Sequence, residues 1–441
     1  MTFILPLSQL DEAPSAATSF PSEASVNSHS LTGTVRASEP NAAIVSSDSP
    51  NLLALLLKDI KEIPYNKSGR PKTPSGNYDR DWPAYNESQA NEQPLFKKIL
   101  SSVCEMIVEP EQGRGRRRVP LADIIFSLAY MIYNNHSVKR FDGYLTDLNN
   151  EGFISRVPCG NTLSNYLRQS QVETVLTSII ELLSLPLKAI ESNFSVDATG
   201  LTPHRYARWV EDRNQDEKKK LWVKLHLITG NKSNIVTAAL VTRGHDADGP
   251  RLGHLLEITK SNFKMSSVSA DSAYLSGENM RLISMAGALP LIKFKSNNVL
   301  DPEASKSTLW IELLRLFLQR HYVYMSHYNM RNNVEATFSM IKRKFHARIF
   351  SVNRQAQVNE VLLKVLCHNI CVLIRALYEL KIDITFPAGT SISIEKKETE
   401  PAEVPIAGGR IIAVRGRRGD RKKRTESSSN KGHQLQISLF D

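Results

Sequence analysis

Five short runs of β-branched and apolar residues lie between residues 194 and 294, and their order constrains the fold more than any other feature. They cover residues 194–197, 221–229, 234–242, 267–271 and 289–294. The first three follow one another directly, whereas helical patterns at residues 251–260 and 278–286 precede the last two. Consecutive strands followed by alternating helices and strands predict a mixed α/β sheet covered by helices.

Helical patterns flank this central region on both sides. Before it, residues 51–190 have helical spacing of apolar residues, with a dense run at residues 121–133. After it, helices are expected at residues 308–345 and 359–380. The last of these contains Cys367, His368 and Cys371, which we interpret as core residues because no second pair of zinc ligands lies nearby.

The two ends of the chain have compositions typical of disorder. Residues 1–50 contain eleven serines, and residues 401–441 carry nine basic and four acidic residues. Such segments bury too little apolar surface to offset the entropy lost on ordering. The sequence therefore predicts a disordered Ser/Ala-rich leader (1–50), a helical N-terminal region (51–190), an α/β domain (191–385) and a disordered basic tail (386–441).

The charge balance favours a polyanionic partner. Lys and Arg number 56 against 45 Asp and Glu, a surplus of 11. Basic stretches at residues 114–118, 342–344 and 415–424 could bind phosphates, although such a stretch is usually only a solvated segment. No membrane partner is expected, because the longest apolar run, at residues 52–57, is far shorter than the roughly 20 residues that span a bilayer. The N-terminus has no signal-peptide pattern and the four cysteines are scattered, so we expect a cytoplasmic protein.

The segment from Tyr328 to Lys342 has the strongest functional pattern. At about 100° per residue of an α-helix, Tyr328, Arg331, Glu335 and Lys342 share a stripe about 60° wide, beside an apolar face. The helix would bury one side and present an acid with two cations and a phenol. A routine surface pair between Arg331 and Glu335 would give the same pattern, so this alternative stays open.

Two further carboxylates follow strand-like runs. Asp197 ends the run Phe-Ser-Val-Asp, and Asp271 ends Ser-Val-Ser-Ala-Asp. A carboxylate at the end of a strand often projects into the crevice where α/β folds place their chemistry. With Glu335, these acids could bind Mg²⁺, which prefers hard oxygen ligands, for a two-metal phosphoryl transfer. Strand-end acids are also common caps and loop residues, so the spacing alone does not decide.

The spacing Tyr-x2-Arg-x3-Glu-x6-Lys resembles the signature of one branch of DDE transposases from bacterial insertion sequences. Residues 222–226 (Trp-Val-Lys-Leu-His) and 271–274 (Asp-Ser-Ala-Tyr) are also similar to that family, and the similarity covers about residues 190–380. The resemblance implies an RNase H-like catalytic core. It also implies that Asp197, Asp271 and Glu335 are the catalytic triad and the metal ligands.

The same resemblance implies the reaction and its partners. Tyr328, Arg331 and Lys342 would assist at the active site and hold element-end DNA, with Arg343 and Lys344 as further DNA contacts. Two Mg²⁺ ions, or Mn²⁺ as a substitute, would support hydrolysis at the element ends and strand transfer of the freed 3′-hydroxyls into target DNA. Because two ends are handled together, we expect a homodimer on double-stranded DNA, at the bacterial nucleoid.

The sequence is also compatible with two alternatives to a transposase. One is a metal-dependent nuclease of the same fold that cuts DNA without joining it. The other is a DNA-binding protein derived from a transposase that has lost catalysis.

Two further segments suggest macromolecular contacts. Residues 162–168 could form the recognition helix of a helix-turn-helix that reads element ends in a major groove. The C-terminal run from Gln436 to Phe440 resembles the short motif by which many bacterial proteins dock on the replication sliding clamp. Gln436, Leu439 and Phe440 would be its anchors.

Overall fold

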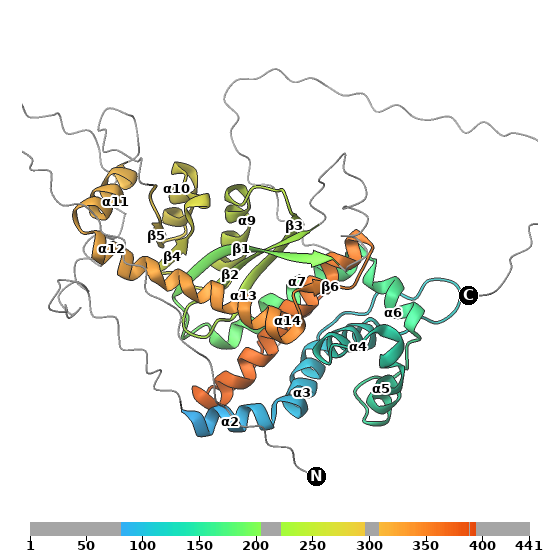
Figure 1. Ribbon diagram of the computed structural model, residues 1–441. Coiled ribbons are helices and arrows are strands. Elements are labelled where there is room, and N and C mark those ends of the chain that lie inside the picture. The colour runs from blue at the N-terminus through green and yellow to red at the C-terminus, as the bar shows by residue number, and fades with distance from the viewer. Residues whose placement is uncertain (1–80, 204–221, 296–307, 388, 394–441) are drawn as a thin grey trace, which may run out of the picture. The chain divides into compact units, whose positions relative to one another are not determined.

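The computed structural model describes residues 81–203, 222–295, 308–387 and 389–393, all of which belong to one compact unit, residues 60–441 (Figure 1). The predicted leader at residues 1–50 lies outside the described residues. So do the basic stretch at residues 415–424 and the clamp-like motif at residues 436–440.

A mixed sheet forms the centre of this unit. Its strands are β1 (Asn193–Pro203), β2 (Val223–Gly230), β3 (Val236–Arg243), β4 (Ser267–Ala270) and β5 (Leu289–Ile292), in the order β3-β2-β1-β4-β5. The first three pair antiparallel, and β4 and β5 extend the sheet in parallel. The mixed sheet predicted from the sequence is confirmed, and a two-residue strand that the sequence did not indicate, β6 (Arg348–Ile349), pairs with the end of β1.

Helices cover both faces of the sheet. One face packs on α13 (Asn332–Phe345) and α14 (Arg354–Glu379), whose apolar residues share a cluster with Leu225 and Leu227. The opposite face packs on α9 (Leu252–Asn262), where the hydroxyls of Thr237 and Thr259 lie 2.9 Å apart. Shorter elements connect these parts: η3 (Gly249–Arg251), η4 (Ser272–Tyr274), α10 (Gly277–Met285), α11 (Thr308–Gln319) and α12 (His321–Tyr328).

The N-terminal part of the described chain is helical, as predicted. It comprises α2 (Trp82–Ala90), α3 (Glu92–Cys104), α4 (Leu121–Tyr133), α5 (Val138–Asn150), α6 (Gly160–Leu167), α7 (Ser170–Ser184) and η2 (Leu185–Leu187). Of these helices, α2, α3, α4, α6 and α7 contact α14, and residues of α3 to α7 belong to the same hydrophobic cluster as the sheet face that α14 covers (Figure 1).

The helix α14 is the central core element. Among the described residues it is the one helix long and apolar enough to cross a membrane, but 78% of its most apolar window is buried inside the protein. Cys367 is fully buried, and the Nε2 of His368 lies 2.9 Å from the carbonyl oxygen of Asn234. The prediction that Cys367 and His368 are core residues is therefore confirmed.

The helical pattern predicted at residues 308–345 is confirmed, but the unbroken helix expected from Tyr328 to Lys342 is wrong. The segment is divided into α11, α12 and α13, with a 3₁₀ turn, η5 (Asn329–Arg331), between the last two. A 3₁₀ turn advances about 120° per residue, compared with about 100° in an α-helix. Three such residues rotate Tyr328 by about 60° from its expected direction, and its side chain is only 6% exposed.

Candidate active site

The register of two parallel strands brings Asp197 and Asp271 together. Val196 pairs with Ala270 at the end of the β1–β4 ladder, so each aspartate directly follows the last residue that its strand contributes to this ladder. Parallel strands lie about 4.8 Å apart, which places these two positions side by side. Asp271 directly follows β4, as predicted. The prediction that Asp197 ends its strand is wrong, because β2 and β6 continue to pair with β1 as far as Pro203.

The guanidinium of Arg331 lies among all three predicted acids. Its Nη2 is 2.6 Å from Oδ2 of Asp197 and 4.0 Å from Oδ2 of Asp271. Its Nη1 is 2.8 Å from Oε1 of Glu335, one helical turn further along α13. Acids from β1, from the end of β4 and from α13 therefore converge on one cation.

A short anchor holds the turn that carries Arg331. The single hydroxyl hydrogen of Ser195, on β1, is shared between Oδ1 of Asn231 at 2.6 Å and the carbonyl oxygen of Met330 at 3.2 Å. Because Met330 lies in η5, this contact fixes the turn against the strand of Asp197. No sequence pattern indicated this role, since Ser195 has the pattern of an ordinary strand residue.

Burial and charge compete at the acidic cluster. Burial raises the pKa of Asp197, and the Asp271 and Glu335 carboxylates raise it further, whereas the N–H of Ala198 and the charge of Arg331 lower it. Burial lowers the pKa of Arg331, but the surrounding carboxylates more than compensate and raise it overall. When ionised, the cluster holds three negative charges against one positive charge, so it can accept further cations.

The donor set suits a hard divalent cation, because carboxylate oxygens are the ligands that Mg²⁺ prefers. In the described parts of the chain, however, no three His, Cys, Asp or Glu side chains form a ready metal-binding group. At this site the three acids do not form such a group because the guanidinium of Arg331 lies between them. The three carboxylates fit a metal by chemistry, provided that Arg331 moves.

The remaining signature residues extend the site along α13 and β1. The Nζ of Lys342 donates to Oγ1 of Thr199 at 2.6 Å, two residues beyond Asp197 on the same face of β1. Burial lowers the pKa of this lysine. Tyr328 is buried beside Arg331, and burial raises the pKa of its phenol. Thr199 was not predicted as a site residue, because its role depends on the pairing of α13 with β1.

The two other predicted DNA contacts differ in their surroundings. Arg343 is exposed, and its Nε donates to the carbonyl oxygen of Ser339 within α13. Lys344 instead pairs with Glu92 of α3 at 2.5 Å and lies over the ring of Tyr133. A DNA phosphate would compete with Glu92 for Lys344, whereas it could approach Arg343 from solvent.

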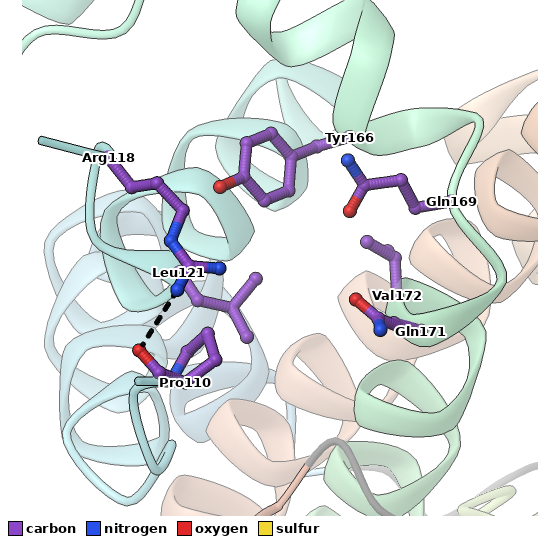
Figure 2. Close-up of a pocket in the computed structure, with 7 residues that line it drawn as sticks. All are labelled: Pro110, Arg118, Leu121, Tyr166, Gln169, Gln171 and Val172. Atoms are coloured by element: carbon purple, nitrogen blue, oxygen red, sulfur yellow. Dashed lines mark hydrogen bonds between the residues drawn. The ribbon is translucent and has the colours of Figure 1, made fainter. Parts of the chain in front are cut away.

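A second polar region lies among the N-terminal helices. A cavity of about 240 Å³ is lined by Pro110, Arg118, Leu121, Tyr166, Gln169, Gln171 and Val172. Figure 2 shows the side chains of Arg118, Tyr166 and Gln169 directed toward the same space. The Nη1 of Arg156 donates to the carbonyl oxygen of Arg117 at 3.0 Å. The basic stretch at residues 114–118 therefore adjoins the end of α6, two features that were separate in the sequence.

Comparison with known proteins gives one match. Residues 189–370 match the family model described as the transposase DDE domain. No curated protein and no solved structure matches this chain significantly. The matched residues span all five main strands of the sheet, the three acids, the signature residues and most of α14. The mixed sheet flanked by helices is thus an RNase H-like core, and residues 189–370 are similar to the transposase DDE domain.

Proposed function

We propose that this chain is the transposase of a bacterial insertion sequence and that Asp197, Asp271 and Glu335 are its catalytic acids. The observation that supports this assignment is their convergence on Arg331 from three separate elements. A routine surface pair between Arg331 and Glu335 would not require two aspartates from neighbouring strands at the same guanidinium. The transposase domain over residues 189–370 agrees with this assignment.

The proposed reaction uses the acids as metal ligands. Two Mg²⁺ ions, or Mn²⁺ as a substitute, would activate the attacking oxygen and stabilise the leaving oxygen of a phosphodiester. Water would attack first, at the element ends, and the freed 3′-hydroxyl would then attack target DNA. No side chain serves as a nucleophile, so the protein contributes by positioning the DNA and by charge.

The signature cations fit contacts to the DNA backbone. The planar fork of Arg331 suits two phosphate oxygens at once, and the ammonium of Lys342 acts as a point charge. Lys342 contacts Thr199, which lies two residues beyond Asp197 on β1, a rise of about 6–7 Å, so the charge of Lys342 lies close to the acids. Arg343 extends the same basic edge into solvent. The buried Tyr328 would pack beside Arg331 and support it rather than contact DNA directly.

The N-terminal helices are proposed to bind the element ends. Asn161, Asn165 and Arg168 recur at helical spacing along α6 and its end, and all three are exposed. Asn and Arg side chains are suited to reading base edges in the major groove. The neighbouring stretch at residues 114–118 and Arg156 would bind phosphates. We assign end recognition to residues 51–190 on this ground.

The assembly follows from the reaction. Two element ends must be cut and joined together, so we propose a homodimer on double-stranded DNA at the bacterial nucleoid. Docking on the sliding clamp through Gln436, Leu439 and Phe440 stays a prediction from the sequence, because these residues lie outside those described.

Strand transfer in vitro tests the proposed function. Labelled element-end DNA and a supercoiled target would be incubated with Mg²⁺ and the wild type, Glu335→Gln or Glu257→Gln. Glu257 is an exposed residue of α9, so its variant makes the same chemical change away from the site. We expect joined product from the wild type and Glu257→Gln, and a loss on the order of 100-fold or more from Glu335→Gln.

The alternatives have distinct outcomes in the same assay. Equal joining by Glu335→Gln would remove Glu335 from the triad. Nicking without joining by the wild type would indicate a nuclease. Binding of the end DNA without any cutting would indicate a transposase-derived protein that has lost catalysis.

A further inference from the structure

We propose that Arg331 is the counter-ion of the acids in the metal-free protein and must leave them before metal ions bind. The inference rests on the proposed function, since it takes Asp197, Asp271 and Glu335 as metal ligands. It adds a role that the signature alone does not give. The same guanidinium that suits a DNA phosphate also closes the acidic site while DNA is absent.

The distances show why the guanidinium and a metal ion exclude each other. Mg²⁺ binds oxygen at about 2.0–2.1 Å with nearly ideal octahedral geometry. Nη2 of Arg331 is already 2.6 Å from Oδ2 of Asp197, and Nη1 is 2.8 Å from Oε1 of Glu335. An ion bound to these oxygens would press against a fixed positive charge within the same few ångströms. Charge repulsion and lack of space therefore both oppose joint occupancy.

The position of Arg331 is held, but not by a complete set of hydrogen bonds. Its side chain is only 14% exposed, and among the described residues its buried Nε has no hydrogen-bond partner. One guanidinium also neutralises only one of three carboxylates. Arg331 therefore keeps a donor that a new acceptor could satisfy, in addition to the two nitrogens that now contact the acids.

A DNA phosphate is the acceptor that fits this unused capacity. Guanidinium groups bind phosphate through two parallel hydrogen bonds, as they bind carboxylates. Arg331 lies at the end of the 3₁₀ turn η5, whose geometry is less favourable than that of an α-helix, so a change of its side chain does not disturb a long helix. Transfer of Arg331 from the acids to DNA would open the site to metal, so metal uptake would follow DNA binding.

Metal binding without DNA tests this proposal directly. Free Mn²⁺ would be followed by its electron paramagnetic resonance signal during titration of the full chain. The proteins are the wild type, Arg331→Met, Arg331→Lys and Arg281→Met. Arg281 is an exposed arginine of α10 paired with Glu278, so its variant removes the same charge elsewhere. We expect Arg331→Met to bind Mn²⁺ at least about tenfold more tightly than the wild type. Arg281→Met should match the wild type, and Arg331→Lys should lie between, because lysine keeps the charge without the fork.

Two further measurements locate the effect. Adding Asp197→Asn to Arg331→Met should abolish the gain in affinity, which assigns the bound ion to the acidic cluster. Thermal unfolding of each variant would show that the fold is intact. Equal affinity of Arg331→Met and the wild type would overturn the proposal. Weaker binding by a folded Arg331→Met would also overturn it, since Arg331 would then assemble the metal site rather than close it.

Failure of the proposed function would look different. If Asp197→Asn leaves Mn²⁺ binding by the wild-type chain unchanged, then the acids are not the metal site. The proposed catalytic assignment would then be wrong, and the role of Arg331 would fall with it. If Asp197→Asn removes binding but Arg331→Met has no effect, only the role of Arg331 fails.

Discussion

Two buried histidines make the stability of this protein depend on pH. Burial lowers the pKa of His226 and of His368 to about 4. The Nε2 of His226 lies 2.8 Å from the hydroxyl of Thr242, and that of His368 contacts a backbone carbonyl. An unfolded histidine titrates near pH 6.5, so between about pH 6.5 and 4 the unfolded chain binds protons that the folded protein does not. The free energy of unfolding therefore decreases as the pH falls through this window, because the contribution of these two histidines is lost.

One buried acid works in the opposite direction. Burial raises the pKa of Glu181 to about 7, so its contribution to stability is lost as the pH rises from about 4.5 to 7. Its effect on the pH dependence of stability cancels about the effect of one of the two histidines. We predict that the wild type is less stable at pH 5 than at pH 7, and that His368→Gln reduces this difference by about 1–2 kcal/mol. Urea denaturation at the two pH values measures it, and Glu181→Gln should enlarge the difference. An unchanged difference in His368→Gln would mean that folding does not lower the pKa of His368.

At the scale of elements, two glycines make room for Trp222, the residue just before β2. A Cβ atom added to Gly244 would lie 2.6 Å from the indole ring, and one added to Gly200 on β1 would lie 2.7 Å from it. The ring also lies under the Nζ of Lys224, which pairs with Asp248. Trp222 therefore fills a space that the turn after β3 and the middle of β1 leave open.

Substitution of Gly244 tests this packing. We predict that Gly244→Ala lowers the free energy of unfolding by about 1–3 kcal/mol, because the indole ring must shift. Gly143→Ala is the matched control. Gly143 lies within α5 with no atom near its added Cβ, so this change should stabilise the protein by about 0.5–1 kcal/mol. Urea denaturation of both variants measures the effects. A Gly244→Ala protein as stable as the wild type would show that Trp222 moves without cost.

The helices and main strands were largely predictable from the sequence, but the short strand and the 3₁₀ turn that connect them were not. Alternating and apolar runs identified the five main strands, and α4 has the bounds that its apolar run indicated. The sequence could not show the two-residue β6, which exists only because β1 offers it a partner. The break at η5 was hidden for a similar reason. Apolar spacing continues across Asn329, while the carbonyl of Met330 finds its partner on β1.

For the candidate site too, the residues could be predicted from the sequence but their contacts could not. Asp197, Asp271 and Glu335 could be chosen from strand-like runs and from the signature spacing. That Arg331 contacts all of them depends on the β1–β4 register and on the rotation at η5, which no local pattern contains. The pairing of Lys344 with Glu92 could not be predicted from the sequence either, since 252 residues separate the two along the chain.

At the scale of the whole molecule, the RNase H-like core and the N-terminal helices share one hydrophobic core. Besides its apolar contacts, α14 places buried amides against the N-terminal helices. The Nδ2 of Asn359 donates to the carbonyl oxygens of Leu167 and Gln169, both at 2.9 Å, and that of Asn369 donates to the carbonyl oxygen of Ile180 at 3.2 Å. Both asparagines are fully buried. Without the N-terminal helices these donors would lose partners, and the apolar face of α14 would be exposed to water.

We therefore predict that residues 191–385 do not fold when produced alone, although the sequence marks them as a separate domain. Residues 60–441 should instead unfold in one cooperative transition, because a single core joins their elements. Urea denaturation followed by circular dichroism and by tryptophan fluorescence measures this, and coincident curves are expected for residues 60–441. The shorter chain should bind a hydrophobic dye and show no cooperative transition. A cooperative transition from residues 191–385 alone would contradict the shared core and would show that these residues form an independently folding domain.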